Sequence, residues 1–304
     1  MWFILISYIE NAIKIFQREK INLSVIRGFS DSITVTFNFV KQEFVPFLKV
    51  LGVIVVPLIL IDFLVKGFFL RDLLTINETS DPFLVIKSSL ITSVGAGVIY
   101  MWTQIVVIAY LRVYYDKYRN GDLNRITSGE VWQVVWKYLG SSILVSIAFG
   151  FIVVLGILFF IVPGIYFGIA LIFLVYCIII QGDSADRAFG GSMALVKGRW
   201  WNVFAYAFVL QLIISVLAYI FNVPYLFVTI KETILGESSN LYGAAFSYYL
   251  ANLGQYLAQS ILVVGIGVRI FSYWEEQEHG TLLDKIGKLG QDEPKEERED
   301  EGIH

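Results

Sequence analysis

Charged residues are scarce in this chain, and they are absent from several long stretches. Only 16% of the 304 residues are Asp, Glu, Lys or Arg, whereas soluble domains carry roughly 25%. Stretches without any charge cover residues 138–182, 200–230 and 238–268. Because a membrane-spanning helix needs roughly 20 apolar residues, this pattern excludes an ordinary soluble domain and indicates a membrane protein.

Cysteine and histidine are almost absent too. The single cysteine, Cys177, cannot form a disulfide within the chain, and we interpret it as a small buried apolar side chain. The two histidines, His279 and His304, both lie in the C-terminal tail, and no His–Cys spacing typical of a metal site occurs. Zinc-protease, serine-hydrolase and P-loop motifs are missing as well. We therefore expect no enzyme, no metal and no cofactor.

The uncharged stretches predict an all-α fold, a polytopic membrane helical bundle of about six transmembrane helices. Pro57 should kink the first helix, and Pro163-Gly164 should turn the chain between the third and fourth. Asp62 lies near the far end of the first helix, where we expect it to be hydrated; the scarcity of other intramembrane carboxylates argues against a proton-coupled pump. The expected spans are roughly 45–65, 87–111, two within 138–182, 201–221 and one within 238–268.

Amphipathic segments precede every second predicted span. Residues 31–41, 130–137 and 186–197 each begin with an acidic residue and end with a basic one, which suits the helix dipole. These three cytoplasmic interfacial helices suggest a threefold repeat of one interfacial helix and two spans, although convergent composition would look the same. Residues 1–20 are also amphipathic and are expected to lie in the membrane interface.

Three regions follow from this pattern. Residues 1–44 form an N-terminal interfacial region, 45–271 a six-span membrane domain and 272–304 an acidic cytoplasmic tail that is disordered from about 290. Eighteen Lys and Arg side chains fall on the side of both termini and four on the other. The positive-inside rule then places both termini in the cytoplasm of a multi-pass protein of the inner (plasma) membrane. The start lacks the features of a cleaved signal peptide.

A basic and aromatic cluster follows the fourth span and is our candidate for binding lipid headgroups. Cationic side chains at the membrane surface attract anionic lipids, and tryptophan favours the interface. The alternative is that the cluster only anchors the chain in its orientation. The residues concerned are Arg187, Lys197, Arg199, Trp200 and Trp201.

Two weaker patterns lie inside the spans. Asn252, Gln255 and Gln259 share one helix face and form a candidate polar seam, which lines a cavity or makes hydrogen bonds between helices. Gly164 and Gly168 are four residues apart and are candidates for close helix packing.

Several segments resemble a bacterial inner-membrane family. The carrying motifs are Pro163–Tyr166, Asp186–Phe189, Ser192–Trp200, Phe29–Ile33 with Glu43–Pro46, and Tyr273–Gly280. Together they resemble the membrane domain associated with glycerophosphodiester phosphodiesterases and uncharacterised polytopic proteins similar to it. The resemblance covers most of residues 25–290 and implies a polytopic inner-membrane protein. No phosphodiesterase domain is attached here, so that activity is not carried over.

These patterns leave three functional hypotheses. The first is a non-enzymatic integral membrane protein that organises the membrane or a membrane complex and contacts anionic lipids. The second is a transporter or flippase-like carrier of an amphipathic substrate. The third is an accessory subunit whose acidic tail recruits a membrane or cytoplasmic protein partner. Membrane lipids are the expected partners, and nothing indicates nucleic acid.

Overall fold

Every regular element in the described part of the chain is a helix. The computed structural model describes residues 20–69, 82–122, 124–234, 236 and 241–289. The predicted interfacial helix over residues 1–20 and the predicted disordered tail after 290 thus lie almost wholly outside the described residues. The helices, in order, are α2 (Phe29–Gln42), α3 (Phe44–Ile54), α4 (Val56–Phe69), α6 (Pro82–Arg119), α7 (Ser128–Phe159), α8 (Ile161–Ala170), α9 (Leu174–Tyr176), the π-helix η1 (Cys177–Gln181), α10 (Ala185–Val196), α11 (Trp200–Thr233) and α12 (Leu241–Leu289).

The predicted all-α membrane bundle is confirmed. Five stretches of the described chain are long and apolar enough to cross a membrane, and six if α3 and α4 together form one bent span. The bend between α3 and α4 is 40°, and Pro57 is the second residue of α4. Since proline lacks an N–H and cannot continue the hydrogen-bond ladder of α3, the kink predicted at Pro57 is confirmed.

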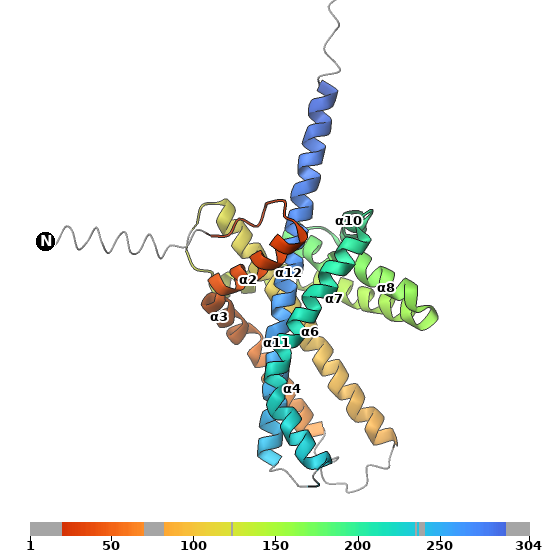
Figure 1. Cartoon of the computed structure of the whole chain (residues 1–304). Helices are drawn as coiled ribbons and strands as arrows, with labels where there is room; N and C mark the ends of the chain where they lie inside the picture. The colour runs from red at the N-terminus through yellow and green to blue at the C-terminus, as the bar shows by residue number, and fades with distance from the viewer. Residues whose placement is uncertain (1–19, 70–81, 123, 235, 237–240, 290–304) are drawn as a thin grey trace, which may run out of the picture.

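The helix α12 forms the axis of the bundle. It packs along α11, α6 and α2, and it extends beyond the other helices at its C-terminal end (Figure 1). By contrast, α7 and α8 form a hairpin that splays away from this axis, at the right of Figure 1. The tip of that hairpin, Phe159 to Val162, is among the most exposed apolar segments of the described chain.

Three helices are longer than the segments predicted for them. The predicted interfacial helix over 130–137 is not separate but forms the first turns of α7. The helix α11 continues through Pro224 to Thr233, and α12 continues past Arg269 to Leu289. A membrane-embedded proline is tolerated where neighbours satisfy the freed carbonyl group. The predicted domain boundary at 271/272 falls inside α12.

The fourth predicted span, Ile161–Gln181, is one apolar helical stretch with an irregular middle. Helix α8 ends at Ala170, a turn follows, and the chain continues through α9 into η1. Side chains satisfy carbonyl groups along it: Ser192 Oγ donates to the Ala170 carbonyl at 2.9 Å, and Arg112 Nη1 donates to the carbonyls of Ile179 and Ile180 in η1. These bonds tie this span to α10 and α6.

Asp62 forms an ion pair, whereas the sequence predicts that it is hydrated. Its carboxylate lies 2.6 Å from the Lys66 ammonium one turn later in α4, and the two side chains are 15% and 8% exposed. Gly95 in α6 makes room for the pair, since a Cβ there would lie 2.1 Å from Asp62 Oδ1. The pair is therefore held between α4 and α6.

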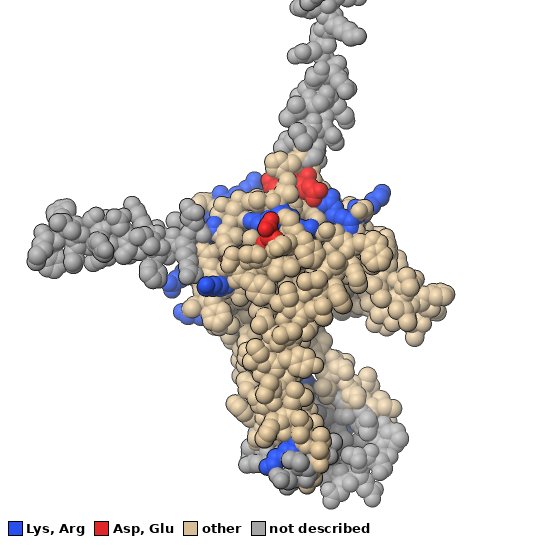
Figure 2. Space-filling model, in the orientation of Figure 1, with Lys and Arg blue, Asp and Glu red and all other residues tan. Residues whose placement is uncertain are grey.

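Charged side chains gather at one end of the bundle. Figure 2 shows them around the upper part, above a long uncharged surface, with further Lys or Arg at the lower tip. At the upper end the Arg27 N–H donates to Ser272 Oγ at 2.8 Å. Residues 27 and 272 thus lie at the same end, so the chain between them makes an even number of passes along the bundle.

Candidate functional site

The junction between α10 and α11 shapes the candidate site. Helix α10 ends at Val196, and Gly198 adopts a left-handed backbone conformation with φ of 78° that a side chain would strain. This turn starts α11 at Trp200, directly beside the C-terminal half of α12. The predicted basic and aromatic residues 199–201 are therefore brought against α12.

A buried arginine from α12 forms the base of this site. Arg269 is 6% exposed. Its Nη1 donates to the Arg27 carbonyl at 2.7 Å and to Ser32 Oγ at 3.3 Å, and its Nη2 donates to Asn202 Oδ1 at 2.7 Å. All these acceptors are neutral, and no carboxylate of the described residues lies within 4 Å of the guanidinium group. The Nε atom is buried and has no hydrogen-bond partner in the described chain.

A second arginine lies at the mouth of the site. The guanidinium groups of Arg199 and Arg269 lie 4.7 and 4.6 Å from the ring centre of Tyr273, which packs against both. Arg199 also forms an ion pair with Glu276 at 2.6 Å. The Tyr273 hydroxyl donates to Asn202 Oδ1 at 2.9 Å. Arg199 and Glu276 thus neutralise each other at the mouth, whereas Arg269 at the base has no negatively charged partner among the described residues.

These residues surround a surface cavity of about 610 Å³, which we call the arginine cavity. It opens at the N-terminal end of α11, where the helix dipole and the free N–H groups favour an anion. A buried charge is costly unless it is paired, so an anionic group in this cavity would stabilise the Arg269 guanidinium group. Its lining is Gly198, Arg199, Trp200, Trp201, Asn202, Arg269, Tyr273 and Glu276.

The structure brings together only part of the predicted headgroup cluster. Arg199, Trp200 and Trp201 line the arginine cavity, whereas Lys197 lines a smaller cavity of about 290 Å³ beside it. Arg187 lines neither, and its Nε donates to Ser184 Oγ at 3.0 Å in the first turn of α10.

Arg269 and Tyr273 were missed by sequence reasoning. Arg269 follows the last uncharged stretch and looks like an ordinary end-of-span anchor. The sequence signal available was the Tyr273 spacing, since residues four apart share a helix face. The partners on α2 and α11 could not be inferred, because they lie far from Arg269 in the sequence.

The candidate polar seam lines none of three cavities in the described part of the chain, of about 610, 290 and 630 Å³. The Asn252 amide donates to the Tyr248 carbonyl of its own helix at 2.7 Å. Gln255 is exposed on the surface of α12, and the Gln259 Oε1 atom is buried without a hydrogen-bond partner in the described chain. Other amides, Gln104 and Gln211, instead line a separate intramembrane cavity of about 630 Å³.

Of the two packing glycines, only Gly164 lies at a close contact. A Cβ on Gly164 would lie 2.6 Å from the backbone nitrogen of Ile157, and a Cβ on Gly156 would lie 2.7 Å from Gly164 Cα. Gly168 has ordinary space, with Val153 Cγ2 at 3.9 Å. The close partner of Gly164 is therefore Gly156 across the hairpin rather than Gly168 along the helix.

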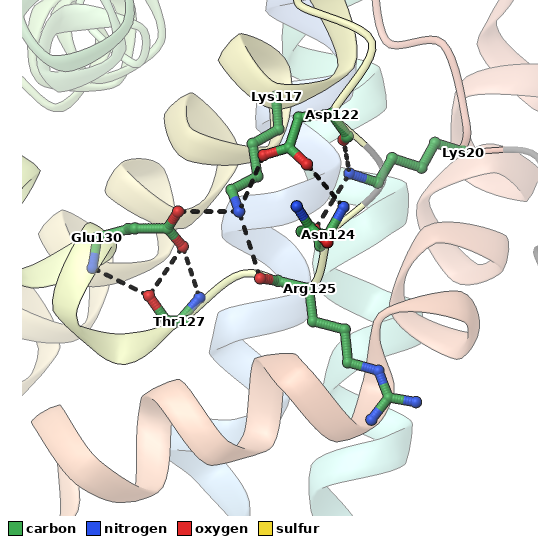
Figure 3. Close-up of polar contacts among 7 residues, drawn as sticks. All are labelled: Lys20, Lys117, Asp122, Asn124, Arg125, Thr127 and Glu130. Atoms are coloured by element: carbon green, nitrogen blue, oxygen red, sulfur yellow. Dashed lines mark hydrogen bonds and ion pairs between the residues drawn. The ribbon is translucent and has the colours of Figure 1, made fainter.

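A second polar cluster joins the start of the described chain to the connection between α6 and α7 (Figure 3). Lys117 pairs with Glu130 at 2.8 Å and Asp122 at 3.4 Å, and Lys20 donates to the Asp122 carbonyl at 2.6 Å. Thr127 and Glu130 form a capping box that begins α7. Lys117 lies between two carboxylates, so this cluster is a structural clamp that holds the connection between α6 and α7.

No group of three or more His, Cys, Asp or Glu side chains that would suit a metal ion occurs in the described residues. A family model described as a domain of unknown function (DUF7847) matches residues 128–272. The match begins at the first residue of α7 and ends within the arginine cavity, between Arg269 and Tyr273. No curated protein and no solved structure matches the chain. The resemblance to phosphodiesterase-associated membrane domains stays a prediction.

Proposed function

We propose that this chain is a non-enzymatic, multi-pass membrane protein that binds anionic lipid headgroups in the arginine cavity and so organises the surrounding membrane. The supporting observation is Arg269, a buried cation whose protein partners in the described chain are all neutral. A phosphodiester in the cavity would supply the negative charge that the neutral partners of Arg269 lack. The aromatic residues Trp200 and Trp201 suit the interfacial depth at which headgroups lie.

The proposed orientation places the arginine cavity at the cytoplasmic surface of an inner (plasma) membrane, with both termini cytoplasmic. The excess of Lys and Arg at this end supports that orientation through the positive-inside rule. Anionic lipids of the cytoplasmic leaflet would then be within reach of the cavity.

Native mass spectrometry of the protein released from mixed vesicles tests this proposal. In vesicles of phosphatidylglycerol and phosphatidylcholine, the wild-type protein should retain phosphatidylglycerol preferentially. Arg269→Gln should abolish the preference, and Arg199→Gln should weaken it. Arg187→Gln is the matched control, because Arg187 lies on α10 outside the cavity. Equal retention of both lipids by the wild type, or loss of the preference in Arg187→Gln alone, would contradict the proposal.

A second candidate function is transport of an amphipathic substrate, favoured by the 630 Å³ cavity within the membrane-spanning region. The polar face of α12 predicts that a transport cavity reaches Gln255, but this cavity is lined by Gln104 and Gln211 and not by Gln255. Reconstituted vesicles that move a fluorescent phospholipid between leaflets would support transport. The third hypothesis, a partner recruited by the acidic tail, concerns residues outside the described chain.

A further inference from the structure

The intramembrane cavity has the character of a ligand site. Its volume of about 630 Å³ lies within the range of small-molecule pockets, which are mostly apolar with few polar groups. It lies between α6, α7, α8, α11 and α12, where the hairpin diverges from the bundle axis. Most of its lining is aliphatic or aromatic, including Ile147, Phe204 and Ile266. Of its two amides, Gln211 donates to Ser215 Oγ at 3.1 Å on its own helix.

A continuous aromatic face of α11 joins this cavity to the arginine cavity. Trp200, Phe204 and Phe208 are four residues apart and therefore lie one above another. The rings of Trp200 and Phe204 are stacked with centres 5.4 Å apart, and those of Phe204 and Phe208 with centres 5.9 Å apart. Trp200 lines the arginine cavity, whereas Phe204 and Phe208 line the deeper one.

One face of α12 joins the same two cavities. Leu262 and Ile266 line the deeper cavity, and Arg269 and Tyr273 line the arginine cavity. These positions recur at spacings of three and four residues, which keeps them on one side of the helix. The two cavities therefore lie one below the other along α11 and α12.

The depth that the two cavities span along α11 suits a lipid. At 1.5 Å per residue, Gln211 lies about 16 Å below Trp200 along α11. That distance is about half of a hydrocarbon core of ~30 Å. A molecule with an anion at Arg269 and an apolar tail along the aromatic face would thus reach the bilayer centre.

We infer that the two cavities together hold one anionic glycerophospholipid, with its phosphodiester at Arg269 and one acyl chain along Trp200, Phe204 and Phe208 into the deeper cavity. This inference rests on the proposed function, since it names the ligand of the same arginine cavity. A free phosphate has the same chemistry at Arg269 but leaves the deeper cavity unused.

Photo-crosslinking tests where the acyl chain lies. The protein is reconstituted in nanodiscs that contain phosphatidylglycerol with a diazirine in the middle of one chain, and labelled peptides are mapped by mass spectrometry. We expect labels on residues 204–208 and 262–266. Ala207→Trp, which fills the cavity that Ala207 lines, should reduce this labelling at least fivefold without changing the headgroup preference. Leu212→Trp is the control, because Leu212 is exposed on α11 outside the cavity.

The outcomes separate the inference from the proposed function. If phosphatidylglycerol is retained preferentially but the labels fall only on exposed positions such as Leu212 and Val216, the acyl-chain site is wrong and the headgroup site stands. If Arg269→Gln leaves both retention and labelling unchanged, both are wrong. If inorganic phosphate at millimolar concentration displaces the lipid and abolishes the preference, the natural ligand is the free anion, and the chain assignment falls.

Discussion

The more hydrophobic of the helices α7 and α12 is the less buried one, which is the reverse of what is found in a soluble protein. The most apolar segment of α7 has a mean hydropathy of 2.8, and only 11% of its residues are buried. The corresponding segment of α12 has a mean hydropathy of 1.4, and 72% of its residues are buried. Lipid tails are as apolar as leucine, so no hydrophobic force drives α7 inward. Polar groups such as Arg269, in contrast, need protein partners and are stabilised at the bundle axis. In this pair of helices, burial therefore follows polarity rather than hydrophobicity.

The buried ion pair in α4 offers the strongest test of that rule. Asp62→Leu would leave the Lys66 ammonium buried without its partner. We expect a loss of about 3 kcal/mol in the free energy of unfolding, measured as a lower thermal midpoint in detergent. The double variant Asp62→Leu with Lys66→Met should recover most of the loss. A single variant as stable as the wild type would show that the pair is hydrated after all.

The hairpin contact at Gly164 is the exception to the exposure of α7. Gly164→Leu would force α8 away from the backbone of Ile157, and we expect a loss of about 2 kcal/mol. Gly168→Leu is the control and should change stability little, because a Cβ there would make only an ordinary contact, 3.9 Å from Val153 Cγ2. The thermal midpoint of each variant measures this. Equal losses would mean that both glycines are packed as the sequence spacing alone suggests.

A leucine scan of glycines compares the two helices directly. In α12, a Cβ on Gly265 would lie 2.3 Å from Leu210 Cδ2, whereas Gly150 in α7 has nothing within 4 Å. Gly265→Leu should therefore destabilise the protein by about 1 kcal/mol, and Gly150→Leu should be neutral in thermal melts. Destabilisation by Gly150→Leu would indicate that α7 has a packing partner outside the described residues.

The smallest effect concerns the exposed clamp between α6 and α7. A hydrogen bond from the Asn124 N–H and the Lys117 ammonium lower the pKa of Asp122. Because the folded pKa is below the ordinary value of about 3.9, the stabilisation is present above about pH 4 and is lost as the pH falls through the folded pKa. Thermal midpoints of the wild type and Asp122→Asn should thus differ slightly at pH 7, and the difference should shrink as the pH falls through the folded pKa of Asp122. A difference that grows towards pH 3 would contradict this sign.

Hydropathy was sufficient to predict the approximate position of the spans, since each needs a long uncharged run. It could not predict their continuity. The chain passes from interface to hydrocarbon within α7 without a helix breaker after Glu130, so a change in polarity does not end the helix. Pro224 likewise lies inside α11, because neighbouring groups in a bundle can satisfy the backbone carbonyl that a proline leaves without its hydrogen bond.

The arginine cavity was only half predictable. Arg199, Trp200 and Trp201 form a local cluster, and the sequence shows it. The burial of Arg269 depends on the Arg27 carbonyl and Ser32 of α2, which are more than 230 residues away in the chain. Such contacts come from tertiary packing, and no local pattern encodes them.

The most direct test of the account is a density map of the protein in phosphatidylglycerol nanodiscs at a resolution that shows side chains. The account predicts a phosphate in the arginine cavity beside the Arg269 guanidinium group, with an acyl chain along Phe204 and Phe208. A carboxylate from elsewhere in the protein beside Arg269, with no lipid in either cavity, would contradict it.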